Sequence, residues 1–202
     1  TAAFRASGFY RDFGGFIDSI GTAASDIEND INSSKSYGGR ASVLLKPSEN
    51  FSVQLSAYLQ NLKTDASNSV DSDPATGRTL YGRLSQSQFV PEFTDVRYRV
   101  YSAVVDADLG FANLVSATSY SSLSQSFRGD LTTQYGGLIE LFFGVPNDFY
   151  QGQLTRVRRF SQEIRLQSPE NERFEWLLGA YYTREKGIID QTFHAVEPGT
   201  LT

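Results

Sequence analysis

Apolar and polar residues alternate through residues 36–61, near the start of the chain. Every second residue of 51–59 is apolar, and the residues between them are Ser, Gln, Ser and Tyr. Residues 37–45 alternate in the same way, except that Leu44 adds one apolar residue to the polar side. A period of two puts the two kinds of side chain on opposite faces of a strand. The pattern predicts a β-hairpin with a tight turn at residues 47–50 and one apolar face.

Similar alternation recurs along the chain and predicts about seven strands in all. The further strands are expected at residues 3–13, 96–109, 114 to about 121, 156–168 and from 174 onward, before the chain leaves through residues 186–202. In the strand that begins at residue 114, the period does not decide which residues share a face. Short turns at 47–50, 110–113 and 169–173 alternate with long polar connections at 14–35, 62–94 and 125–155.

The alternation of long and short connections carries a prediction about the fold. In an antiparallel up-and-down sheet, successive connections lie at opposite ends of the strands, so all short turns share one rim and all long connections the other. Outer-membrane barrels have this arrangement, and strands of about eleven residues are long enough to cross the hydrocarbon. We expect an all-β fold: an antiparallel up-and-down meander of about seven strands that is part of a larger transmembrane β-barrel.

Aromatic residues near the strand ends fit the interfacial girdles of such a barrel. They are Phe51, Phe111, Phe174 and Trp176 at the short-turn rim and Tyr10, Tyr37 and Tyr182 at the other rim. The same aromatics also fit the core of a soluble sandwich. The barrel predicts that Leu55, Ile164 and Leu178 face lipid, whereas the sandwich predicts that protein buries them. On the opposite face, Glu163 and Arg165 would point into the barrel lumen.

Composition excludes several classes of protein. The chain has no Cys, which excludes disulfides, zinc–thiolate sites and cysteine nucleophiles. The net charge of −5 argues against nucleic acid as a partner, because phosphate binding needs a basic face. The sequence contains no run of about eighteen apolar residues, so it predicts no transmembrane helix. No signal peptide opens the chain, and we expect both ends to continue into a longer polypeptide.

Candidate chemistry is sparse. His194 is the only histidine of the sequence, and we expect it to be a solvated loop residue rather than a metal ligand or a catalytic base. Residues 71–73 (Asp-Ser-Asp), followed by Gly77, partly resemble a calcium loop, but the bidentate Glu at the required offset is missing, which favours a solvated turn. The acidic residues of the first long connection are expected to be solvated: Asp26, Glu28 and Asp30. We predict no catalytic, cofactor-binding or metal site, and therefore no enzyme.

Three segments carry a resemblance to a known family. They are FRASGFYRDFGGFID at 4–18, SSKSYGGRASVLLKPSENFSVQLSAYLQ at 33–60 and RRFSQEIRLQSPENERFEWLLGAYYTREK at 158–186. The chain resembles the barrel of TonB-dependent outer-membrane receptors of the alphaproteobacterial (sphingomonad) type, most specifically at 160–169 and 174–182. The resemblance covers essentially all 202 residues. It implies an active transporter of the outer membrane, built as a barrel of about twenty-two strands with a plugged lumen.

The resemblance also implies partners. In that family an N-terminal plug binds the substrate together with the outer loops, and a short box couples the receptor to the TonB complex in the periplasm. Residues 1–202 match neither plug, coupling box nor closing C-terminal strand, so we expect them to be an internal part of the barrel domain. The expected partners are outer-membrane lipid, the rest of the barrel with its plug, the TonB complex through the missing N-terminal part, and a scarce nutrient such as an iron-siderophore, cobalamin or an oligosaccharide. The alternatives are a passive outer-membrane channel and a soluble all-β carbohydrate-binding module.

The long connections would then form part of an outer vestibule. Their aromatics could stack on a ligand or pack the loops on each other: Phe89, Phe93, Tyr135, Phe142, Phe143, Phe149 and Tyr150. Residues 138–145 are unusually apolar for a loop, and we expect either a short packed element or a ligand-facing tip.

Overall fold

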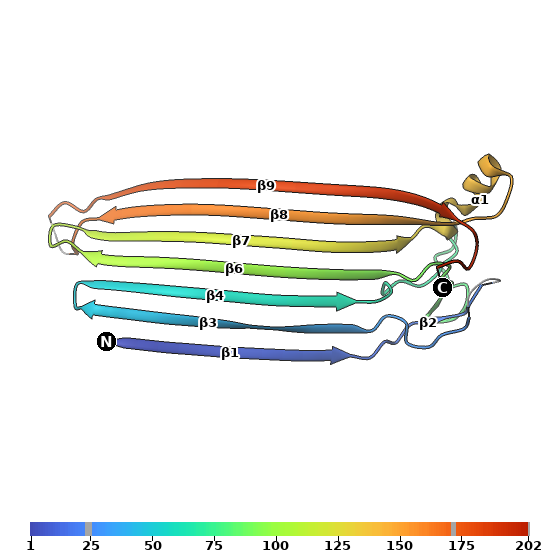
Figure 1. Ribbon diagram of the computed structural model, residues 1–202, viewed down its shortest axis with the longest axis horizontal. Coiled ribbons are helices and arrows are strands. Elements are labelled where there is room, and N and C mark those ends of the chain that lie inside the picture. The colour runs from blue at the N-terminus through green and yellow to red at the C-terminus, as the bar shows by residue number, and fades with distance from the viewer. Residues whose placement is uncertain (23–25, 171–172, 202) are drawn as a thin grey trace.

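Seven long strands form one antiparallel sheet in the computed structural model, which describes residues 1–22, 26–170 and 173–201. Each long strand lies beside the next long strand along the chain, in the order β1-β3-β4-β6-β7-β8-β9 (Figure 1). The strands are β1 (Ala2–Phe13), β3 (Ser34–Ser48), β4 (Phe51–Thr64), β6 (Phe93–Asp108), β7 (Asn113–Asp130), β8 (Asp148–Gln167) and β9 (Leu177–Val196). The predicted all-β meander of seven strands is confirmed.

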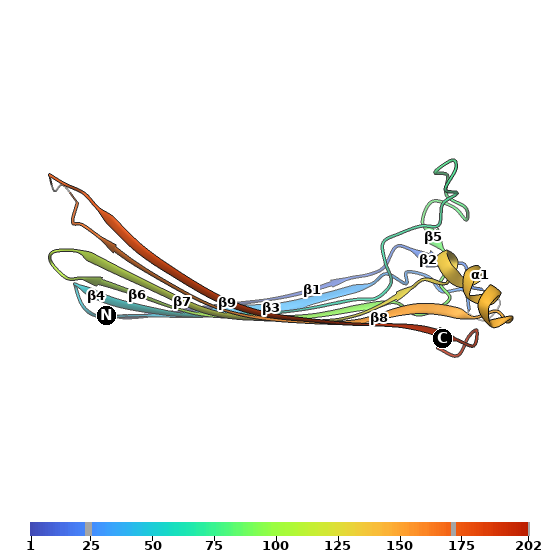
Figure 2. The same cartoon turned by 90° about the horizontal axis from the view of Figure 1, so that it is seen from above.

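The sheet is a single open layer. Seen from above, its strands follow a twisted curve and do not close on themselves (Figure 2). Strands β1 and β9 form its two edges, so each has a neighbour on one side. Such an edge presents unpaired backbone N–H and C=O groups that can pair with another strand. The sheet can therefore be extended at both ends.

Short and long connections are segregated as predicted. The turns between β3 and β4, between β6 and β7 and between β8 and β9 lie at one end of the sheet, and the long connections lie at the other (Figure 1). The long connections contain β2 (Asp18–Ser19) and β5 (Ser85–Gln86), which pair in parallel, and α1 (Thr132–Phe143).

The predicted hairpin is present with a tighter turn. Strand β3 continues through Ser48, with a register irregularity after Leu45, so the turn consists of Glu49 and Asn50 rather than four residues. Proline cannot donate a ladder hydrogen bond, which accounts for an irregular register at Pro47.

Several sequence-based boundaries are wrong. Strand β7 runs to Asp130 instead of ending near residue 121, and β8 begins at Asp148, so the third long connection is 131–147 and not 125–155. Strand β9 begins at Leu177 and not at the expected residue 174. It continues through Val196, so residues 186–196 belong to the sheet and are not an exit segment. The predicted turn at 169–173 includes 171–172, which lie outside the described residues.

Candidate functional site

Strand register assigns every strand residue to one of two faces. The apolar face carries the even-numbered residues of β1, β7, β8 and β9 and the odd-numbered residues of β3, β4 and β6, and the polar face carries the others. The register also decides the facing of β7. Thr118 lies between Ala103 and Gln162, so it is on the apolar face.

An apolar band covers the apolar face next to the short turns. Its members come from six strands: Phe4, Val43, Leu45, Val53, Leu55, Ala103, Val105, Ile164, Leu166, Leu178 and Ala180. Leu55 is 48% exposed, Ile164 44% and Leu178 64%. The band is therefore a broad hydrophobic surface of the kind that marks contact with protein or membrane.

Polar side chains inside the apolar band satisfy one another. The Thr118 hydroxyl donates a hydrogen bond to the Gln162 side-chain carbonyl, and the Gln162 side-chain N–H donates to the Ser116 hydroxyl over 2.9 Å. Mutual pairing lowers the cost of removing such groups from water. The three polar residues thus remain compatible with a hydrophobic surrounding.

A row of aromatic residues ends the apolar band on the side of the long connections. Tyr101, Tyr120 and Phe160 lie opposite one another on β6, β7 and β8. At the short-turn end, Phe111 is 67% exposed and Phe174 78% exposed. A correction concerns Tyr182, which lies opposite Gln162 in the half of β9 next to the short turns and not at the rim of the long connections.

A basic belt follows the aromatic row on the same face. We use this name for Arg97 and Arg99 of β6, Arg156 and Arg158 of β8, and Arg184 and Lys186 of β9. Sequence reasoning missed the belt, although the two-residue spacing of these cations on three strands could have shown it.

The polar face is lined by hydroxyl groups and by paired charges. One row crosses five adjacent strands as Ser42, Ser56, Ser102, Ser119 and Ser161. Glu163 and Arg165, which were predicted to share a face, form an ion pair. The distance from Arg165 Nε to Glu163 Oε1 is 3.0 Å. On the same face, the Arg159 guanidinium donates a 2.6 Å hydrogen bond to Glu185. This surface is suited to contact with water and polar groups.

Two carboxylates hold the long connections onto the sheet. Asp130, at the end of β7, accepts hydrogen bonds from the backbone N–H groups of Phe89 (2.6 Å) and Val90 (3.0 Å). Glu92 accepts from the backbone N–H groups of Asp130 and Ser67, both over 2.9 Å. Val90 is fully buried. The two carboxylates therefore tie the second long connection to the third.

A further anchor holds the first long connection. The Asn32 side-chain oxygen accepts from the backbone N–H groups of Phe16 (2.7 Å) and Ile17 (2.8 Å), and its amide donates to Asn68. Ile17 is 1% exposed. The long connections therefore have small cores of their own and do not depend on the apolar band for burial.

A cavity of about 260 Å³ opens between the second and third long connections. Phe89, Gly136, Glu140 and Asp148 are among its lining residues. Asp148 is 4% exposed. Burial raises the pKa of the Asp148 carboxyl, a hydrogen bond from the Gly199 N–H lowers it, and the charge of Asp130 raises it further. The net effect is a pKa above the ordinary aspartate value.

The sequence-based candidates lie apart from one another. His194 is in β9 and its ring stacks on Tyr150 at a centroid distance of 4.8 Å, so the expected loop position is wrong. Asp73 accepts hydrogen bonds from the backbone N–H groups of Ala75 and Thr76, as in a turn. Among the described residues, no group of three or more His, Cys, Asp or Glu side chains is placed to hold a metal ion.

Phe93, Phe149 and Tyr150, predicted for the long connections, lie in strands β6 and β8. The aromatics at this end of the sheet divide between packing and exposure. Phe149 of β8 stacks on Phe193 of β9 and meets the edge of Tyr135, which packs α1 against β8. Phe142 and Phe143, by contrast, are 77% and 65% exposed. Residues 138–143 are the second half of α1, which has no buried residue.

Comparison with protein-family models, with curated proteins and with solved structures finds no match. In the described part of the chain, no helix is long and apolar enough to cross a membrane.

Proposed function

We propose that this chain is part of the wall of a transmembrane β-barrel in the outer membrane, within a TonB-dependent transporter that imports a scarce small nutrient. The observation that carries the proposal is the exposed apolar band. On β6 it runs from Tyr101 to the turn residue Leu109, and on β8 from Phe160 to Leu166. The stretch on β6 has nine residues, which is about the length a tilted strand needs to cross the hydrocarbon.

The open sheet supports the same proposal. Both edge strands are available for pairing, and a barrel removes such edges by adding further strands until it closes. The hydroxyl row and the ion pairs of the polar face suit a lumen that contains water and a plug. The mutual hydrogen bonds of Ser116, Thr118 and Gln162 suit a lipid-facing surface.

The long connections would then stand at the cell exterior and form part of the vestibule that admits the nutrient. Energy-coupled import rests on the family resemblance of the sequence. A passive channel would have the same kind of wall. Uptake that is insensitive to a proton uncoupler would favour a passive channel.

Contact with lipid tests the wall directly. The test uses nitroxide labels at Leu55, Ile164 and Leu178 in proteoliposomes of the complete protein. A lipid-soluble relaxation agent should strongly accelerate the electron-spin relaxation of these labels. Labels at the neighbouring polar-face positions Gln54 and Glu163 serve as matched controls and should respond to a water-soluble agent. Protection of the first three labels from the lipid-soluble agent would overturn the proposal and favour a sheet buried in protein.

A further inference from the structure

The basic belt places six cations from β6, β8 and β9 on one face of the sheet. Arg99, Ser122, Arg158 and Lys186 form one cross-strand row, and Arg97, Ser124, Arg156 and Ile188 form the next. Arg97, Arg156, Arg158, Arg184 and Lys186 are exposed to solvent. The nearest carboxylates on this face are Asp95 and Asp190, so positive charge is in excess.

Much of this charge has no counter-charge within the described chain. Arg156, Arg158, Arg184 and Lys186 make no ion pair with a described residue. Lys186 lies directly opposite Arg158, and like charges at directly opposed positions of a sheet destabilise it. An external anion at this site would remove that repulsion.

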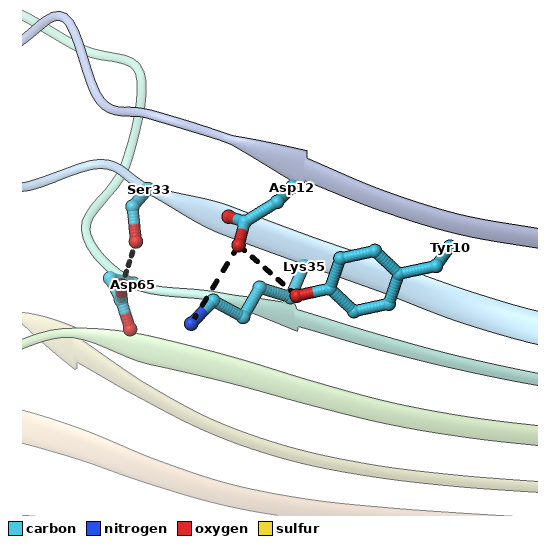
Figure 3. Close-up of polar contacts among 5 residues, drawn as sticks. All are labelled: Tyr10, Asp12, Ser33, Lys35 and Asp65. Carbon is cyan, nitrogen blue, oxygen red and sulfur yellow. Dashed lines mark hydrogen bonds and ion pairs between the residues drawn. The ribbon is translucent and has the colours of Figure 1, made fainter.

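Three cations elsewhere on the sheet have a carboxylate partner. At the far edge of the same face, the Lys35 ammonium lies 3.9 Å from the Asp12 carboxylate, which also accepts a hydrogen bond from Tyr10 (Figure 3). On the polar face, Arg159 and Arg165 each contact a glutamate. The belt differs from these three sites because most of its six cations have no such partner among the described residues.

An apolar depression of about 510 Å³ adjoins the basic belt. Small residues on adjacent strands form its floor, and the aromatic row closes it on the side of the belt: Ala41, Ala57, Ala103, Thr118, Tyr101 and Tyr120. Arg99 is two residues from Tyr101 on the same face of β6. Its guanidinium is fixed by hydrogen bonds to the Gln60 carbonyl and the Asn61 side chain, both over 2.7 Å.

We propose that the basic belt binds the phosphate headgroup of an anionic membrane lipid whose acyl chain lies along the apolar depression. The inference rests on the proposed function, because it places the apolar band in the hydrocarbon and the belt at headgroup level. Guanidinium groups bind phosphate through paired N–H···O bonds, and Ser122 and Ser124 offer hydroxyl donors between the two groups of cations. The site thus joins a phosphate-binding part to an acyl-binding part.

The test uses the complete protein purified in dodecyl maltoside and titrated with fluorescent bisphosphorylated lipid A, with phosphatidylcholine as the zwitterionic comparison. The belt variant is Arg156→Gln/Arg158→Gln/Lys186→Gln. The control variant, Arg5→Gln/Arg40→Gln/Arg165→Gln, loses the same charge from the polar face. Each cation near a membrane surface strengthens the binding of anionic lipid. The belt variant lacks three of these cations, so it should bind lipid A at least about tenfold more weakly. The control variant should bind as the unmodified protein does.

Two further measurements separate this inference from the proposed function and from misfolding. Quenching of a label at Ile164 by the lipid-soluble agent should persist in the belt variant, which shows that the wall is still inserted. The conservative variant Arg156→Lys/Arg158→Lys should keep most of the salt-sensitive affinity for lipid A.

Equal binding of lipid A by the belt and control variants, with the label at Ile164 still in lipid, would overturn the inference alone. Displacement of lipid A by inorganic phosphate at a similar concentration would also overturn it, because the belt would then be a site for free anions. Loss of lipid contact at Ile164 in the unmodified protein would overturn the proposed function and this inference together.

Discussion

The Arg159 guanidinium donates a 2.6 Å hydrogen bond to the Glu185 carboxylate on the polar face of the sheet. Arg158, the preceding residue, lies opposite Lys186 on the other face. Two adjacent arginines of one strand therefore have opposite surroundings, one neutralised by a partner and one beside a like charge. Strand alternation alone produces this difference. The difference between the two faces means that an experiment can determine which way each residue faces.

Cysteine labelling should report the facing residue by residue. The chain has no native Cys, so Ser161→Cys on the polar face and Ile164→Cys on the apolar face can be compared without a background signal. With the protein in membranes, we expect a water-soluble maleimide to modify Cys at 161 at least about tenfold faster, because the reactive thiolate needs water. Mass spectrometry of the labelled protein measures both rates. Equal rates would show that both faces are in water.

Loss of the Asp130 carboxylate should release the second long connection from the sheet. In Asp130→Ala, the backbone N–H groups of Phe89 and Val90 lose their shared acceptor. Hydrogen bonds to charged groups contribute about 1.5–3 kcal/mol each, so hydrogen exchange at residues 87–92 should become much faster. Asp108→Ala, which removes a turn acceptor at the opposite end of the sheet, is the control and should leave exchange at 87–92 unchanged.

The raised pKa of Asp148 predicts a pH dependence. A group whose pKa is raised by folding favours the folded state most below its unfolded pKa, and this contribution is lost as the pH rises through the folded pKa. Asp148→Asn cannot ionise and can still accept from the Gly199 N–H. The variant should therefore retain the order of the third long connection at neutral pH better than the unmodified protein does, and the difference should vanish at acidic pH. Hydrogen exchange at residues 146–150 between pH 3 and pH 8 checks this, and a difference that grows on acidification would contradict it.

The sequence predicts the sheet best where one of its faces is apolar. Residues 37–45 and 51–59 alternate cleanly because they cross the apolar band. The second half of β7 is rich in Ser, with Ser122 and Ser124 on one face and Ser121 on the other, so its period is lost where both faces are polar. Beyond Lys186, β9 has apolar residues on both faces, Ile188 on one and Ile189 and Phe193 on the other, so its period is lost as well. Periodicity therefore reports the band and not the full strand length.

The site was less predictable than the sheet. Sequence patterns identified the paired polar residues Glu163 and Arg165, but not the Asp130 and Glu92 anchors. Those anchors depend on which long connections meet in space, and hydrophobic periodicity carries no information about that contact. The predicted loop position of His194 was wrong because the predicted end of β9 was wrong.

The isolated chain should not fold as a soluble monomer. Its two sheet edges and its apolar band would be exposed to water, which favours association. Sedimentation and circular dichroism should show aggregates in buffer and an ordered β-sheet in detergent micelles. A sharp, monomeric melting transition without detergent would contradict this expectation.

Substitution of Gly38 should disturb the pairing of the first strands. A Cβ atom at Gly38 would lie 2.2 Å from the Leu59 carbonyl oxygen, whereas one at Gly8 would have its nearest neighbour at 3.5 Å. Gly38→Ala should therefore destabilise the protein in detergent by about 1–3 kcal/mol, and Gly8→Ala should have a much smaller effect. Thermal unfolding of both variants measures the difference, and equal melting temperatures would contradict it.

The unequal lengths of the strands give the sheet a sloping edge at the end of the long connections. Strands β8 and β9 have 20 residues each, whereas β1 has 12. From Phe160 to Asp148 the β8 backbone continues for about 40 Å beyond the aromatic row, against about 23 Å for β4 from Ala57 to Thr64, at about 3.3 Å per residue. In the proposed orientation, α1 stands on the taller side and the β1 edge on the lower side. The long-connection ends of β8 and β9 would therefore stand farther from the lipid than the end of β4.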